Sequence, residues 1–117
     1  MQTAVIKKTR ATALALTCLV LSATVFDARA ITIRGAESCG IWVKERQEKK
    51  ISTFIHQRWL AGYLSGIAVG NGKDVLKGTD NESIFLWMDN YCQANPLKDI
   101  ADGSEVLFLE LVKQKKL

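Results

Sequence analysis

The sequence predicts an all-α fold, a small bundle of about four helices with one disulfide, after a cleaved signal peptide. Three observations lead to this prediction. Apolar residues recur at helical spacing in four segments of the chain. The part that follows the N-terminal segment contains two cysteines, Cys39 and Cys92. No segment of this part shows the convincing alternation of polar and apolar residues that is typical of a strand.

The first 30 residues have the form of a secretory signal. Lys7, Lys8 and Arg10 precede an uncharged run from residue 11 to residue 26, and Ala28-Arg29-Ala30 follows it. A basic region, an apolar region and small residues at the cleavage site are the parts of a signal peptide. A retained transmembrane anchor is the alternative, but the run is short for a span of about 20 residues. We therefore expect cleavage after Ala30, no stable membrane insertion afterwards, and a location in the periplasm.

Residues 31–117 are expected to form one small helical domain. Four of the 16 basic residues and one of the 12 acidic residues precede residue 31, so the domain keeps a net charge of +1. Such a balance gives no support for binding to nucleic acid or to an anionic membrane. A domain of this size is near the lower limit for a self-sufficient core, and an exported protein with an even number of cysteines favours a disulfide. We expect that disulfide between Cys39 and Cys92.

Two helices are expected in the first half of the domain. The first begins at the N-cap Ser38 and ends near Glu48. The second begins near Ser52 or Thr53 and ends near Val69. Its second half has no charge, so it is expected to be a buried central helix. The residues expected on the apolar faces are Cys39, Trp42, Val43 and Arg46 in the first helix and Phe54, Ile55 and Trp59 in the second.

Two more helices are expected after a loop over residues 70–81. The third begins at Thr79 or Asp80, where residues 79–82 have the form of a capping box, and it ends near Gln93. The fourth opens at Asn95–Pro96, because Asn is a strong N-cap and Pro is favoured at the first helical position. The fourth helix is expected to have an apolar face made of Leu97, Ile100, Ala101, Ser104, Leu107, Phe108 and Leu111.

The second helix carries a possible groove of small residues between aromatic ones. Gly62 and Gly66 are spaced by four and share a face, with Trp59 and Tyr63 beside them. Glycine costs about 1 kcal/mol in a helix relative to alanine, and close approach of another group usually offsets that cost. We expect a ring of this chain to pack over the glycines; the alternative is a groove that binds a ligand or a partner.

Residues that would indicate an enzyme are sparse. A Cys–His nucleophilic pair would need His56, the only histidine, next to a reduced Cys39 or Cys92. The same three residues show no zinc-ligand spacing. No phosphate-binding loop or dinucleotide fingerprint is present in the sequence. We therefore expect no enzymatic activity, no metal and no cofactor, with a Cys/His-dependent enzyme as the less favoured alternative.

The cysteine pair and two segments together resemble a known family. The segments are WLAGYLSG (residues 59–66) and YCQANPL (residues 91–97). They are similar to the HdeA-like superfamily of small all-helical periplasmic proteins with one disulfide. They are also similar to the related immunity proteins that protect bacteria from effectors of the type VI secretion system. The resemblance extends from about Ser38 to Val112.

The resemblance implies a function as well as a fold. It implies a Cys39–Cys92 disulfide in a periplasmic all-α monomer or homodimer that binds other proteins. In one branch of the superfamily, low pH opens a compact dimer and exposes apolar surface to unfolding clients. The first expectation is therefore a stress or acid chaperone. In the other branch the protein neutralises one type VI secretion effector, and this is the alternative expectation.

Overall fold

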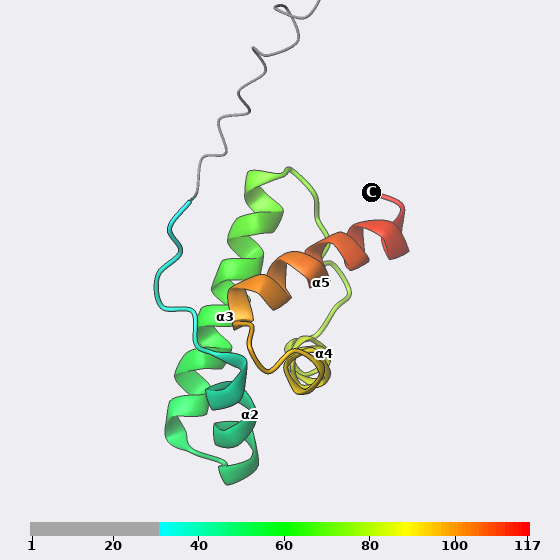
Figure 1. The fold of residues 1–117 in the computed structure, drawn as a ribbon. Coiled ribbons are helices and arrows are strands. Elements are labelled where there is room, and N and C mark those ends of the chain that lie inside the picture. The colour runs from blue at the N-terminus through cyan, green and yellow to red at the C-terminus, as the bar shows by residue number, and fades with distance from the viewer. Residues whose placement is uncertain (1–30) are drawn as a thin grey trace, which may run out of the picture. The chain divides into compact units, whose positions relative to one another are not determined.

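The computed structural model describes residues 31–117, and within them it contains four α-helices and no strand (Figure 1). The helices are α2 (Cys39–Glu48), α3 (Ile51–Gly70), α4 (Asn81–Ala94) and α5 (Ile100–Lys115). The prediction of an all-α fold with about four helices is confirmed. None of these four helices combines the length and the apolar character needed to cross a membrane. The predicted signal peptide, residues 1–30, lies outside the described residues.

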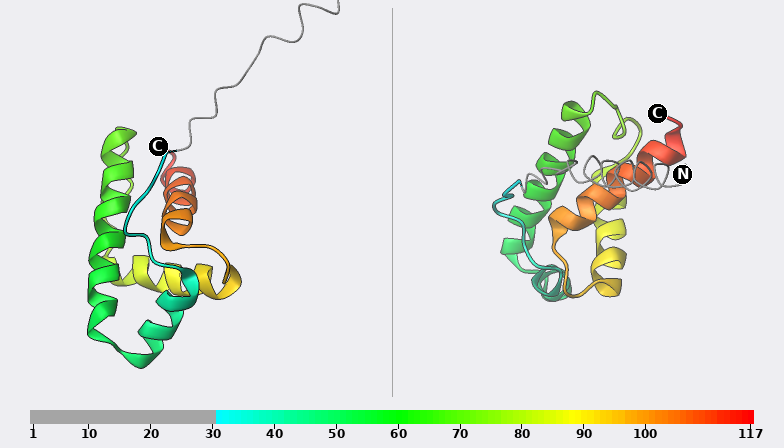
Figure 2. Two further views of the ribbon diagram at one scale, coloured as in Figure 1. Left: turned by 60° about the vertical axis from the view of Figure 1, so that its left-hand side comes forward. Right: turned by 45° about the horizontal axis from the view of Figure 1, so that its top comes forward.

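The four helices pack around one apolar core. α3 is the longest helix, and both α5 and α2 pack against it. α4 contacts α2 and α5 and runs across the direction of α3, as the left view of Figure 2 shows. The core therefore lies between crossing helices rather than inside a parallel bundle. The fully buried side chains at its centre are Trp42, Leu60, Leu64, Val75, Met88 and Ile100.

The starts of α2 and α5 meet the end of α4 at one corner of the domain. Cys39 and Cys92 form the predicted disulfide there, with 4.7 Å between their Cα atoms. Beside it, the Cys39 amide donates a hydrogen bond of 2.9 Å to the Lys98 carbonyl. The Ile100 amide donates one of 3.0 Å to the Glu37 carbonyl. These two backbone bonds and the disulfide fix three helix ends relative to one another.

A second connection between α2 and α4 is polar. Asp89 of α4 accepts two hydrogen bonds from the Arg46 guanidinium, at 2.9 and 2.6 Å. It also accepts one from the Trp42 indole nitrogen at 2.8 Å. The hydrogen bonds to Asp89 raise the pKa of Arg46, although partial burial opposes the shift. The predicted position of Arg46, on the same face of α2 as Trp42, is confirmed.

The predicted start of the last helix is wrong. α5 begins at Ile100, and Asn95 is instead the C-cap of α4, where its backbone and side-chain nitrogens both donate to the Tyr91 carbonyl. The N-cap of α5 is Asp99, which forms a capping box with Asp102. Leu97 therefore lies in the connecting turn and is 97% exposed. Asp99 is the better helix start because a capping box provides side-chain acceptors for amides of the first helical turn and for the amide of the N-cap residue itself.

Two other helix starts lie at or close to the predicted positions. α4 is capped by Asp80, one of the two expected positions, whose side chain accepts a hydrogen bond from the Ser83 amide. The capping box expected at residues 79–82 does not form, because Asp80 rather than Thr79 is the N-cap. α3 begins at Ile51, slightly before the expected position, and the Thr53 hydroxyl donates to the Glu45 carbonyl in the last turn of α2.

The disulfide supports a first prediction. Replacing Cys92 by serine should lower the free energy of unfolding by about 2–5 kcal/mol, the usual loss when a native disulfide is removed from a small domain. Thermal or urea unfolding of the protein purified from the periplasm measures this loss. Cys39→Ser should give the same loss, because either change removes the same bond. Melting of Cys92→Ser that equals the wild type would contradict a structural role.

Two glycines of the helices offer a matched pair of substitutions. A Cβ atom on Gly103 would lie 2.6 Å from the sulfur of the buried Met88 and 2.8 Å from the Tyr91 ring. We expect Gly103→Ala to destabilise the domain by about 1–3 kcal/mol through overpacking. Gly62→Ala meets no atom within 4 Å, so its better helix propensity should stabilise by up to about 1 kcal/mol. Urea unfolding curves of the two variants should shift in opposite directions; shifts in the same direction would contradict the packing at Gly103.

Candidate functional site

Trp59, one aromatic residue of the expected groove, is covered by the segment that precedes α2. Its indole nitrogen donates a hydrogen bond of 3.1 Å to the Arg34 carbonyl. Gly35 lies so close that a Cβ atom on it would be 2.8 Å from the same nitrogen. Gly35 also has a φ of +81°, which favours glycine. Trp59 therefore holds the N-terminal segment of the domain against α3.

Tyr63, the second aromatic residue, connects α3 with α5. Its ring stacks on Trp59 with 4.8 Å between the ring centroids. Its hydroxyl donates a hydrogen bond of 3.3 Å to the Glu105 carboxylate. Burial raises the pKa of Tyr63, and the nearby negative charge of Glu105 adds to the shift. The phenol consequently stays protonated at neutral pH and serves as a hydrogen-bond donor.

The expected packing of a ring over the glycines is wrong. A Cβ atom on Gly62 or Gly66 would meet no atom within 4 Å, and both residues are exposed. Leu60 and Leu64 of the same helix are fully buried. Because one residue turns the helix by about 100°, residues two positions further on point away from the leucines. The buried leucines thus fix the direction of the glycines, which face out of the domain.

The glycines belong to a continuous exposed surface along α3, which we call the outer face of α3. Its members are Ile51, Phe54, Ile55, Arg58, Gly62, Ser65, Gly66 and Val69. Ile51, Phe54, Ile55 and Val69 are 90%, 56%, 65% and 82% exposed, respectively. The predictions that Phe54 and Ile55 lie on an inner face and that the second half of this helix is buried are both wrong.

One charge lies on the outer face of α3. The Arg58 guanidinium carbon is 4.6 Å from the centroid of the Phe54 ring, a cation–π contact. With a rise of about 1.5 Å per residue, the face from Ile51 to Val69 is about 27 Å long. The sequence contains a signal for the outer face of α3, since Ile51, Ile55, Gly62 and Val69 repeat at helical spacing. The same spacing would also fit a buried face, and only the packed structure decides between the two.

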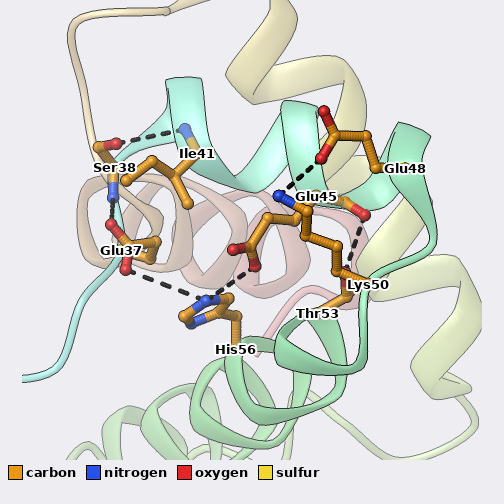
Figure 3. Close-up of polar contacts among 8 residues, drawn as sticks. All are labelled: Glu37, Ser38, Ile41, Glu45, Glu48, Lys50, Thr53 and His56. Carbon is orange, nitrogen blue, oxygen red and sulfur yellow. Dashed lines mark hydrogen bonds and ion pairs between the residues drawn. The ribbon is translucent and has the colours of Figure 1, made fainter.

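A second cluster brings together an imidazole and two carboxylates from three segments (Figure 3). The His56 Nε2 atom of α3 lies 3.1 Å from Oε2 of Glu45 in α2 and 3.9 Å from Oε2 of Glu37. The side chains of His56 and Glu45 are 17% and 15% exposed. Oε2 of Glu45 is buried and accepts no hydrogen bond, so His56 is the polar group that faces it. The sequence alone does not predict this cluster, because its members are not neighbours along the chain.

The residues considered for catalysis do not come together. Cys39 and Cys92 are joined to each other, so neither presents a thiolate. His56 faces carboxylates. Within residues 31–117, no group of three or more His, Cys, Asp or Glu side chains is placed to hold a metal ion. What this arrangement offers chemically is an imidazole next to two carboxylates and an apolar surface on α3.

A comparison with known proteins found no relative of this chain. No protein-family model, curated protein or solved structure matches the chain.

The His56 cluster supports a prediction. His56→Ala should lower the free energy of unfolding by about 1–3 kcal/mol at pH 7, because it removes the polar group that faces the buried Oε2 of Glu45. Urea unfolding measures the loss. Gln57→Ala, a truncation at the next position of the same helix, is the control and should cost less. Equal losses for the two variants would show that the cluster contributes no specific stability.

Proposed function

We propose that this protein is a non-enzymatic periplasmic protein with HdeA-like architecture that binds other proteins, acting as a stress or acid chaperone. The observation that carries the proposal is the outer face of α3. Four large apolar side chains lie exposed there along one rigid helix, with one charge among them. Contiguous exposed apolar surface of this kind is characteristic of protein interaction sites.

The composition of the outer face of α3 suits partners that vary in sequence. Its contacts would come from apolar side chains and from exposed backbone at Gly62 and Gly66, and neither requires a precise hydrogen-bonding partner. Unfolding proteins expose apolar segments of many sequences.

The polar connections between the helices provide a physical basis for sensitivity to acid. The Arg46–Asp89 pair joins α2 to α4, and the His56–Glu45 contact joins α2 to α3. Both contacts need an ionised carboxylate, so loss of that charge would remove them. The disulfide does not respond to protons, so α2 would remain tied to α4 while its other contacts weaken.

The absence of an available thiol supports a binding role over a Cys/His-dependent enzyme. Cysteine acts as a nucleophile in its thiolate form, and both cysteines of residues 31–117 are in the disulfide. Intact mass after alkylation without reductant tests this point in the purified protein. Two alkylated thiols at Cys39 and Cys92 would reopen the enzyme hypothesis.

The chaperone proposal predicts activity in an aggregation assay. The purified protein should suppress the aggregation of a mixed periplasmic extract at pH about 2–3, where most carboxylates are protonated. Ile55→Ser should weaken this suppression, because it removes an apolar side chain from the outer face of α3. Leu109→Ser on α5 is the matched control, since Leu109 is also 65% exposed but lies on another helix. Light scattering measures the effect.

The same assay distinguishes the alternative, a protein that neutralises a type VI secretion effector. A protein that suppresses no aggregation at pH about 2–3 is not an acid chaperone. Tight binding of one folded effector at neutral pH, with the effector gene next to this one, would favour the immunity function. A pull-down from periplasm with the purified protein as bait would provide the partner for that measurement.

A further inference from the structure

We propose that Asn71 is a site of spontaneous chemical modification, at which the chain converts its own asparagine to aspartate or isoaspartate and thereby weakens the C-terminal end of α3. Asn71 is the C-cap of α3, and Gly72 follows it. Both residues are exposed. The modification needs no enzyme and no partner, so it is independent of the proposed binding role.

The reaction uses only atoms of these two residues and one water molecule. The Gly72 amide nitrogen loses its proton and attacks the carbonyl carbon of the Asn71 side chain, which forms a succinimide ring. The side-chain nitrogen takes up a proton and leaves as ammonia. Water then opens the ring at one of its two carbonyl carbons. Opening at one carbonyl gives aspartate; opening at the other gives isoaspartate, in which the main chain runs through the side-chain carbon.

The glycine at position 72 favours this attack. Glycine has no Cβ atom, so its nitrogen can approach the preceding side chain with little steric hindrance. A Cβ atom on Gly72 would meet no atom within 4 Å, so neighbouring groups leave this space open. Gly72 has a φ of +61°, a left-handed conformation that favours glycine at the end of a helix. The way in which α3 ends therefore places a glycine directly after an asparagine.

Both reacting groups take part in hydrogen bonds at the folded helix end. The Asn71 side-chain nitrogen donates to the Ile67 carbonyl at 2.8 Å. The Gly72 amide donates to the Val69 carbonyl at 3.1 Å. Attack requires the Gly72 amide to leave its acceptor, and helix ends open more easily than helix centres. The rate of modification should therefore follow the opening of the last turn of α3.

The other three asparagines of the chain are internal controls. Asn95 precedes Pro96, whose nitrogen carries no proton and cannot make the attack. Asn81 and Asn90 lie in α4, and each is followed by a residue with a bulky side chain. The modification should therefore be specific to the end of α3.

The product weakens the end of α3 for two reasons. An ionised carboxylate cannot donate the hydrogen bond that Asn71 gives to the Ile67 carbonyl. It also places a negative charge at the carbonyl end of the helix, where the macrodipole disfavours it. The loop that starts here enters the core at Val75, which is fully buried. The modification thus acts where α3 is joined to a loop that contributes to the core.

Peptide mass spectrometry tests the site in the folded protein, expressed from the full chain and purified from the periplasm. After storage in mildly alkaline buffer made with heavy-oxygen water, trypsin releases residues 59–73, which contain Asn71, and residues 78–98, which contain the other asparagines. Asn71 should convert at least about tenfold faster than any of the others, because a lower barrier enters the rate exponentially. The converted peptide should carry one heavy oxygen. An unmodified Asn71, or equal conversion of all four asparagines, overturns the proposal.

A matched pair of glycine substitutions tests the dependence on helix opening. Gly70→Ala lies in the last turn of α3 and Gly62→Ala lies in its middle, and neither new Cβ atom would meet another atom within 4 Å. Alanine favours a helix more than glycine does, so Gly70→Ala should make the last turn open less often. It should slow the conversion of Asn71 more than Gly62→Ala does. Equal rates in the two variants overturn the dependence on opening of the last turn.

Urea unfolding of two variants tests the effect of the product. Asn71→Asp carries the charge of the aspartate product, and Asn71→Ala loses the same hydrogen bond without adding a charge. Asn71→Asp should unfold at a lower urea concentration than Asn71→Ala, and both should unfold below the wild type. Added salt should reduce the difference between the variants, because it screens the interaction of the charge with the helix end. A midpoint of Asn71→Asp equal to that of the wild type overturns the proposed weakening of α3.

Discussion

The corner where Cys39 meets Cys92 is the constraint on which the rest of the structure depends. The disulfide joins the start of α2 to the last turn of α4. The backbone bonds from Cys39 to Lys98 and from Ile100 to Glu37 bring the start of α5 to the same place. A domain of this size has a small core, so covalent and backbone links between helix ends replace part of the apolar contact that a larger protein would use.

The corner also determines which face of α3 remains exposed. Once α2, α4 and α5 are held together, their apolar side chains cover the side of α3 that carries Leu60 and Leu64. Only one short segment, around Arg34 and Gly35, reaches further around the helix, where it covers Trp59. No element of residues 31–117 covers the opposite side of α3, so its apolar residues remain in contact with solvent.

The helices themselves were largely predictable, because apolar spacing and capping residues are local properties. Where the prediction failed, two local signals competed. Asn95 and Pro96 suit a helix start, but Asn95 closes α4, and Asp99 with Asp102 provides the capping box that starts α5. The His56–Glu45 contact could not be predicted at all, since it depends on how α2 and α3 lie against each other.

The sequence alone determined the helical fold, the approximate ends of most helices and the single disulfide. Each of these follows from spacing along the chain or from the number of cysteines. The tertiary structure decided the direction in which α3 faces, because Phe54 and Ile55 fit an apolar stripe whether or not another helix covers it. α3 is 20 residues long and has apolar residues on more than one side. Its three shorter neighbours cannot cover all of this apolar surface. What remains uncovered is the surface from which a function can be argued.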